Sequence, residues 1–252
     1  KDLASTNVAK EGHNMATKTQ YRALSKVFAY PAEGYHADVA ACQAMLNSQY
    51  PDAAVEFRRF SEFVQNHSES ECELIFTKTF HIQAICYLDL GYVIFGEDYK
   101  RGEFLVNMKE EQAKVDNDCG SELPDNLANV LELMARTQDR EFLEELAVGV
   151  LQPALTSMIA EFDDARIQLK EKVLKKMHKA LLQQDLEGGN IYRDALAALQ
   201  KVLAKDFAGI HYDNASLQPM IGGAFLQNCG TGGCSTNPLQ APVKQDLSVG
   251  ML

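Results

Sequence analysis

The sequence has 252 residues, of which 46% are hydrophobic and 23% charged, a composition typical of a globular protein and unlike that of a disordered chain. A chain of this length can bury one sizeable core, so we expect one principal domain. The 24 Lys and Arg residues against 35 Asp and Glu residues give a formal net charge of −11. This charge argues against nucleic acid as a partner, because phosphates require neutralising cations, and it is compatible with a basic peptide partner.

Neither a membrane-spanning segment nor a secretory signal is predicted. The longest apolar stretches, at residues 82–90 and 148–155, are too short or too interrupted for a bilayer span, which needs about 20 residues. Residues 1–14 are polar and lack the apolar run of a secretory signal. The six cysteines lie mostly singly, unlike those of a disulfide framework. We therefore expect a cytoplasmic protein that is not an integral membrane protein.

Helical periodicity dominates the sequence. Apolar residues recur three and four positions apart, and almost no stretch alternates between apolar and polar residues, so we predict an all-α fold. Residues 1–15 are expected to be a disordered segment, and residues 16–207 to form a single-domain helical bundle of about ten helices. Residues 208–252, rich in Gly, Asn, Ser and Thr, keep no helical or strand period. We expect them to form a long irregular C-terminal tail, extended or disordered.

The first three helices are predicted at residues 17–29, 35–49 and 51–67, each from an apolar face at helical spacing. Pro31 stops the first helix, because proline is not tolerated in a helix interior. Pro51 opens the third, because the first turn of a helix accepts proline.

A long central helix is predicted next, over about residues 69–92. Ser68 is expected to cap it, with acidic residues in its first turn, where the helix dipole favours negative charge. We expect this helix to break near Gly91 or Gly96.

The remaining predicted helices are separated by turn-forming residues or glycines. Pro124 is expected to open the helix that follows the loop at residues 116–122, with Asp125 in its positive first turn. The other helices are predicted at residues 99–115, 141–151, 153–162, 165–184 and 191–204.

The sequence lacks the usual catalytic signatures, namely a phosphate-binding glycine loop, HExxH, CxxC and GxSxG. We therefore expect that the protein is not an enzyme and that it needs no cofactor. Cys229 and Cys234 form the only local cysteine pair. The glycines between them allow both thiolates to reach one metal ion or to form a disulfide, and an inert tail segment is the alternative.

Two blocks of residues carry a resemblance to a known family. The first runs from residue 79 to 109, and the second, Glu-Leu-Pro-Asp-Asn-Leu at 122–127 with Val-Leu-Glu-Leu at 130–133, follows it. Together they resemble the central signature of the NarJ-like (nitrate reductase delta) assembly chaperones of molybdenum oxidoreductases, which are related to the TorD/DmsD-type redox enzyme maturation proteins. The first block consists of Thr79, Phe80, His81, Tyr87, Leu88, Gly91, Tyr92, Phe95, Gly96, Glu97, Tyr99, Lys100, Arg101, Gly102, Leu105, Met108 and Lys109.

The resemblance covers about residues 17–207 and is most specific over residues 74–134. Looser matches include Asn190, Ile191 and Tyr192 before an Ala- and Leu-rich helix. Two departures stand out, because the family commonly has Asp at the position of His81 and because the helix at 165–184 is longer than the usual connection.

This resemblance implies a cytoplasmic protein that binds the apo catalytic subunit of a molybdenum oxidoreductase, such as a nitrate or nitrite oxidoreductase. The chaperone would recognise the N-terminal segment of that subunit and hold it until the molybdopterin guanine dinucleotide cofactor is inserted. A helical bundle suits this role, because it can take a peptide helix in an apolar groove.

By position in the signature, seven residues are predicted to form the groove and its rim. The aromatic residues would provide apolar contact area, Glu97 and Asp125 complementary charge, and Arg101 a bidentate anchor for a carboxylate. The alternative places Phe80 and Tyr87 in the core and pairs Arg101 with Glu97. The predicted peptide-binding residues are Phe80, His81, Tyr87, Tyr92, Glu97, Arg101 and Asp125.

Two other functions remain open. The protein could be a permanently bound structural subunit of such an oxidoreductase, with its tail wrapped around a partner. It could also be a small helical enzyme or metal-binding protein that uses Cys229 and Cys234.

Overall fold

The computed structural model describes residues 18–82, 84–163 and 190–211. The predicted helix at 165–184, the N-terminal segment, most of the predicted tail and the Cys229 and Cys234 pair lie outside the described residues. Within them the fold is all-α, as predicted, and the only β-type pairing is one isolated bridge. The helices are α1 (Thr19–Phe28), α2 (Tyr35–Gln49), α3 (Pro51–Asn66), α4 (Glu69–Phe80), α5 (Leu90–Phe95), α6 (Lys100–Lys114), α7 (Leu127–Arg136), α8 (Arg140–Glu144), the π-helix η1 (Glu145–Leu151), α9 (Gln152–Ala160) and α11 (Tyr192–Asp206).

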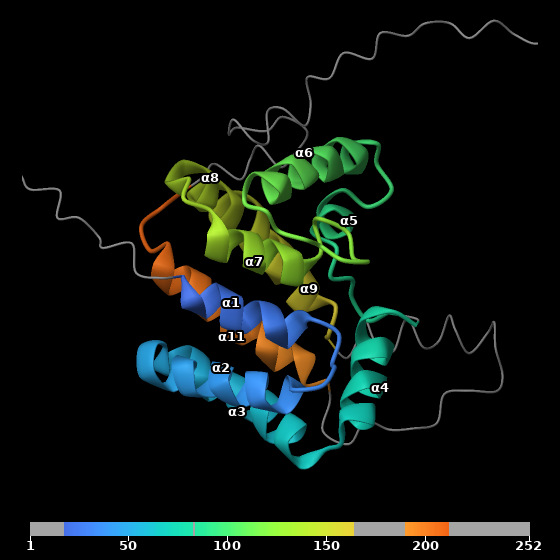
Figure 1. The fold of residues 1–252 in the computed structure, drawn as a ribbon, viewed down its shortest axis with the longest axis vertical. Helices are drawn as coiled ribbons and strands as arrows, with labels where there is room; N and C mark the ends of the chain where they lie inside the picture. The colour runs from blue at the N-terminus through green and yellow to red at the C-terminus, as the bar shows by residue number, and fades with distance from the viewer. Residues whose placement is uncertain (1–17, 83, 164–189, 212–252) are drawn as a thin grey trace, which may run out of the picture.

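The last described helix, α11, lies in the middle of the bundle. It packs against α3 and α9, while α1 packs against α2 and α7, and α2 against α3. In Figure 1, α2 and α3 lie below α1 and α11, α6, α7 and α8 lie above them, and α4 runs across the direction of its neighbours at one edge. The first and the last described helices therefore belong to one core.

Aromatic side chains join α4 to that core. Tyr192, at the start of α11, is 1% exposed, and its ring centroid lies 5.0 Å from that of Phe60 in α3. The rings of Phe76 and Phe80 in α4 lie 5.8 and 4.8 Å from it. The Tyr192 hydroxyl lies 3.2 Å from the Tyr35 hydroxyl, so the buried polar atoms are also partnered. We call Phe60, Phe76, Phe80 and Tyr192 the aromatic centre.

At the other end of α11, Asp206 ties three elements together. Its carboxylate accepts hydrogen bonds of 2.7 Å from the Tyr21 hydroxyl of α1 and from the hydroxyl of Tyr50, between α2 and α3. A carboxylate at a helix C-terminus is disfavoured by the helix dipole. These charge-assisted bonds offset that cost.

Local signals in the sequence fix several helix boundaries as predicted. Helix α2 begins at Tyr35, and Pro51 is the first residue of α3. Ser68 and Glu71 form a capping box, in which Glu71 N–H donates to the Ser68 hydroxyl and Ser68 N–H donates to the Glu71 carboxylate.

The long central helix is the main error of the prediction, because α4 ends at Phe80 and residues 81–82 and 84–89 are not helical. The Ile85 and Cys86 amides turn back to donate to the Thr79 carbonyl, and the chain then leaves to pair with a distant segment. Gly96, with φ of 59°, ends α5 as predicted, since glycine adopts this conformation without strain.

Helix α7 also begins later than predicted. Pro124 lies in a turn, and Asn126 is the cap, because its side-chain oxygen accepts a hydrogen bond from the Ala128 amide. Asn is a strong N-cap residue and competes successfully with proline for the position of the helix start. Asp125 therefore precedes the helix instead of lying in its first turn.

The predicted helices at 141–151 and 153–162 form one continuous run, Arg140–Ala160, through the π-helix η1. Pro153 falls within the first turn of α9 and does not interrupt it. Among the described helices, this run alone is long and apolar enough to cross a membrane, and 67% of its apolar window is buried in the fold. Such burial is typical of a core helix.

Candidate functional site

The two blocks of the signature lie against each other. The Leu90 amide donates to the Asp125 carbonyl at 3.0 Å, and the Leu127 amide donates to the Leu88 carbonyl at 2.9 Å. These bonds form the isolated antiparallel bridge between Asp89 and Asn126. The bridge joins the start of α5 to the start of α7, so the signature marks a junction between elements.

Asp125 lies inside this junction. It is fully buried, at 0% exposure, and its Oδ2 accepts a hydrogen bond of 2.8 Å from the Gly91 amide. Its Oδ1 is buried without a hydrogen-bond partner. Burial raises the pKa of Asp125 to about 6; the nearby Asp89 also raises it, while the Gly91 bond and Arg101 oppose the shift. Asp125 was expected on the rim, and its burial corrects that expectation.

Arg101 pairs with Asp89, at 3.8 Å, rather than with Glu97. Its guanidinium carbon lies 5.2 Å from the centroid of the Tyr92 ring, a cation–π contact. Burial raises the pKa of Asp89, and Arg101, Asn126 and His81 oppose that shift. We call Asp89, Arg101 and Asp125 the acid–arginine cluster.

Beside this cluster, Tyr87 and Tyr92 form the wall of a groove. Their ring centroids lie 4.4 Å apart in an edge-to-face arrangement, which is the favoured geometry for aromatic pairs. The cavity that they line has a volume of about 410 Å³. We call it the tyrosine groove. Its lining residues are Ala84, Ile85, Cys86, Tyr87, Tyr92, Val93, Ser157, Met158 and Glu161.

The other predicted site residues lie elsewhere. Phe80 is 4% exposed and belongs to the aromatic centre, so the core alternative holds for it. His81 is exposed at the end of α4, with its ring 5.4 Å from that of Phe76. Glu97 is exposed in the turn between α5 and α6. Of the seven predicted residues, the structure brings Tyr87 and Tyr92 into the groove and Arg101 and Asp125 behind it.

Three residues that line the groove are distant in sequence from Tyr87 and Tyr92. Ser157, Met158 and Glu161 lie on or just after α9, which packs against α5. The sequence of α9 has the pattern of a core helix, so it does not indicate that these residues line a groove. Asp89 was also missed, although an acidic residue within the apolar run at 82–90 was a usable signal of a buried charge.

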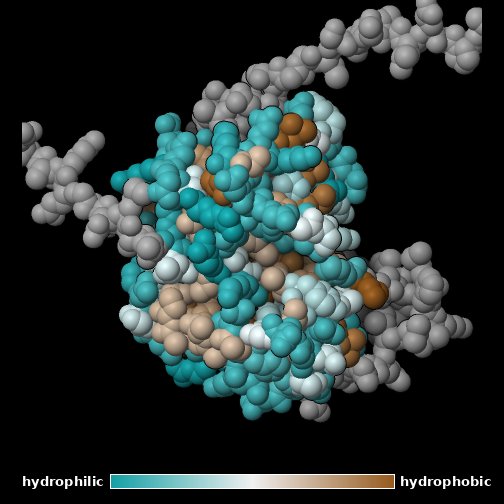
Figure 2. Space-filling model, in the orientation of Figure 1, coloured by the Kyte–Doolittle hydropathy of each residue, from teal (hydrophilic) through white to brown (hydrophobic). Residues whose placement is uncertain are grey.

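Exposed apolar side chains occur on the surface, and one of them belongs to the groove. Figure 2 shows hydrophobic side chains scattered over a mostly hydrophilic face. Tyr87 is 43% exposed, and Ile82, close to it in the chain, is 67% exposed. Of these two residues Tyr87 lines the cavity, and an exposed aromatic residue at a cavity is more informative than isolated apolar residues on a surface.

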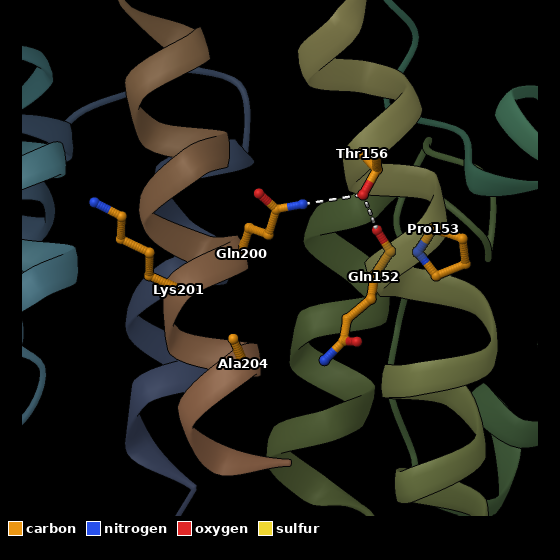
Figure 3. Close-up of a pocket in the computed structure, with 6 residues that line it drawn as sticks. All are labelled: Gln152, Pro153, Thr156, Gln200, Lys201 and Ala204. Atoms are coloured by element: carbon orange, nitrogen blue, oxygen red, sulfur yellow. Dashed lines mark hydrogen bonds between the residues drawn. The ribbon is translucent and has the colours of Figure 1, made fainter. Parts of the chain in front are cut away.

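A second cleft, of about 610 Å³, lies between α9 and α11. Figure 3 shows Gln200 pointing across it to Thr156, to whose hydroxyl it donates a hydrogen bond of 3.0 Å. Lys201 points away from α9, and its ammonium group pairs with Glu56 at 2.6 Å. Among the described residues that line it there is no aromatic side chain, and Lys201 is not directed into it, which makes this cleft a weaker candidate than the tyrosine groove.

No group of three or more potential metal ligands occurs in the part of the chain that the structure describes. The four cysteines of this part are not in disulfides, and burial raises the pKa of the Cys42 thiol to about 12 and of Cys72 to about 11. These thiols remain protonated at neutral pH and are poor nucleophiles.

A scan against protein-family models and a search of the curated proteins returned no match for this sequence. The resemblance to the NarJ-like chaperones therefore depends on the motif residues alone.

Proposed function

We propose that the protein is a cytoplasmic assembly chaperone of the NarJ-like class. It binds the N-terminal segment of the apo catalytic subunit of a molybdenum oxidoreductase at the tyrosine groove, and it holds that subunit for insertion of the molybdopterin cofactor. The role needs no catalytic residue and no cofactor in the chaperone itself.

The observation that carries this proposal is the position of the groove at the signature. Tyr87 and Tyr92 belong to the first signature block, and the second block holds the start of α5, the helix that carries Tyr92. Two blocks that are separated in sequence thus serve one cavity. If the signature residues only maintained the core, they would be buried, whereas Tyr87 and Tyr92 are at least partly exposed.

The chemistry of the groove suits an apolar peptide segment. Tyrosine rings provide large contact areas at low entropic cost. Met158, on the opposite helix, is buried beneath the groove and adds apolar volume under its floor. Glu161 also lines the groove, and the chain carries a net charge of −11, so a basic client segment would be attracted to it.

A purification from the native source tests the proposal. The tagged protein is recovered from cells with and without molybdenum cofactor synthesis, and the copurifying catalytic subunit is assayed for cofactor. The proposal expects association with cofactor-free subunit only. Equal recovery of cofactor-loaded subunit would instead support the structural-subunit alternative.

A groove variant tests the location. Replacing both Tyr87 and Tyr92 by Ala removes the wall, and recovery of the catalytic subunit should fall at least tenfold. Tyr99→Ala is the matched control, because Tyr99 is a tyrosine that is 74% exposed and does not line the groove. Equal loss in both variants would place the contact elsewhere.

A further inference from the structure

The position of Tyr92 depends on the acid–arginine cluster. Tyr92 follows Gly91 in the first turn of α5, and the Gly91 amide is held by the Asp125 carboxylate at 2.8 Å. On its other side, the Tyr92 ring is covered by the Arg101 guanidinium. The groove wall is therefore attached to the cluster at both the backbone and the ring.

This attachment is tight. A Cβ atom built on Gly91 would lie 2.8 Å from Asp125 Oδ2 and 3.4 Å from the Cγ of Arg101. The stem of Arg101 and the Asp125 carboxylate thus enclose the backbone that carries Tyr92. A displacement of either group is transmitted to the tyrosine, because packed interiors leave little free space.

Hydrogen bonds satisfy only part of the cluster. Asp125 Oδ1 and Arg101 Nε are both buried without a hydrogen-bond partner. Arg101 pairs with Asp89 at 3.8 Å and lowers the pKa of both Asp89 and Asp125, and His81 also lowers the pKa of Asp89. Loss of one negative charge is therefore not compensated by another hydrogen bond within the cluster.

We propose that Asp125 is a positioning residue of the tyrosine groove. Its carboxylate holds the Gly91 amide and so fixes the backbone that carries Tyr92, while Asp89 pairs with the Arg101 that covers the Tyr92 ring. The charged Asp125 thereby keeps Tyr87 and Tyr92 in the arrangement that receives a client. Asp125 itself, being buried, contacts no client. The effect on client binding rests on the proposed function, whereas the control of the groove wall by Asp125 does not.

Protonation supplies a test of this role. Burial raises the pKa of Asp125 to about 6, so the carboxylate is mostly charged at pH 7.5 and mostly neutral at pH 5. The groove wall should therefore change its geometry between these two values.

The experiment places a fluorescent reporter in the wall. The chain has no tryptophan, so the substitution Tyr87→Trp introduces a single indole that reports on its contact with Tyr92. In the full-length protein, the emission of this indole is followed from pH 7.5 to pH 4.5. We expect a transition with its midpoint near the pKa of about 6 of Asp125.

Three further variants in the reporter background identify the group responsible. Asp125→Asn should remove the transition and show the low-pH emission throughout. Glu97→Gln, which changes an exposed acid on the neighbouring turn, should keep it. His81→Gln should also keep it, and a loss of the transition in this variant would assign it to the histidine and overturn the proposal.

The reporter alone keeps the proposal falsifiable if Asp125→Asn does not fold. Absence of any transition while circular dichroism shows the helices intact would contradict it. So would an unchanged transition in a folded Asp125→Asn protein.

Client binding gives a separate readout. If the proposed function is right, Asp125→Asn should recover at least threefold less catalytic subunit at pH 7.5. A reporter transition without any copurifying client would contradict the proposed function and leave the positioning role intact.

Discussion

The aromatic centre is buried, and the acid–arginine cluster is buried at Asp125 and partly exposed at Asp89 and Arg101. Different interactions hold the two regions. The ring centroids of Phe60, Phe76 and Phe80 lie within 5.8 Å of that of Tyr192. The Tyr192 hydroxyl also has a hydrogen-bond partner. Around Asp125, one carboxylate oxygen holds a backbone amide and the other has no hydrogen-bond partner. The centre is stabilised by many contacts, whereas the geometry of the cluster depends on a few charged groups.

This difference predicts two kinds of response to substitution. Loss of a ring from the centre should lower stability and leave the remaining geometry close to its original form. A change in the cluster should cost less stability and alter the groove.

The largest effect is expected for Phe60→Ala in the aromatic centre. Phe60 is 0% exposed and packs on Phe57 and Tyr192, so truncation should lower the free energy of unfolding by about 3–5 kcal/mol. Urea denaturation measures it. Val55→Ala, on the same helix at 64% exposure, should change the free energy by less than about 0.5 kcal/mol; similar losses in the two variants would show that Phe60 does not act through packing.

Asp206→Ala should come second, at about 2–3 kcal/mol, because it leaves the Tyr21 and Tyr50 hydroxyls without their acceptor. Both oxygens of the Asp206 carboxylate accept hydrogen bonds, whereas only one oxygen of the Asp125 carboxylate does. A double-mutant cycle with Tyr50→Phe tests the cause. Strict additivity of the two losses would refute the coupling.

Gly91→Ala should destabilise the protein by about 2 kcal/mol, since the new Cβ would lie 2.8 Å from Asp125 Oδ2 and 2.9 Å from Phe104 Cδ1. Thermal unfolding measures this loss. Gly102→Ala is the matched control, because no atom lies within 4 Å of its Cβ position and alanine in an exposed helix should stabilise by about 0.5–1 kcal/mol. Only the first substitution should also reduce client recovery.

The smallest effect concerns pH. Because the folded state raises the pKa of Asp125 from 3.8 to about 6, the folded protein binds a proton before the unfolded chain does. Its stability relative to Asp125→Asn should therefore increase as the pH falls through 6, by about 1 kcal/mol between pH 7 and pH 5. Paired urea titrations at the two pH values measure it, and a constant difference would contradict the buried-acid assignment.

Local signals predicted much of the fold. The helices that begin at Tyr35 and Pro51, and the Ser68 capping box, follow from residues within one or two turns. The break after Phe80 and the late start of α7 could not be predicted in this way, because they arise from hydrogen bonds between residues 88–90 and 125–127. Tertiary pairing there overrides helical periodicity.

The candidate site could be predicted only in part, because tertiary packing forms it as well. Tyr87 and Tyr92 follow from the motif, and the structure brings them together. Asp125 was identified as a site residue but was expected at the rim. Its burial could not be predicted, because the residues around it in the motif are mostly hydrophilic. Met158 was not predicted, because only the packing of α9 against α5 brings it to the groove.

The central position of α11 has a consequence for how the protein is made. Tyr192 covers aromatic rings of α3 and α4, yet it leaves the ribosome long after both helices have emerged. During synthesis the apolar faces of α3 and α4 stay open until α11 arrives, and such surfaces are prone to aggregation. A protein proposed to protect an unfinished partner would thus pass through a similarly unprotected stage of its own, and nascent chains stalled before residue 192 should be more sensitive to protease than the finished one.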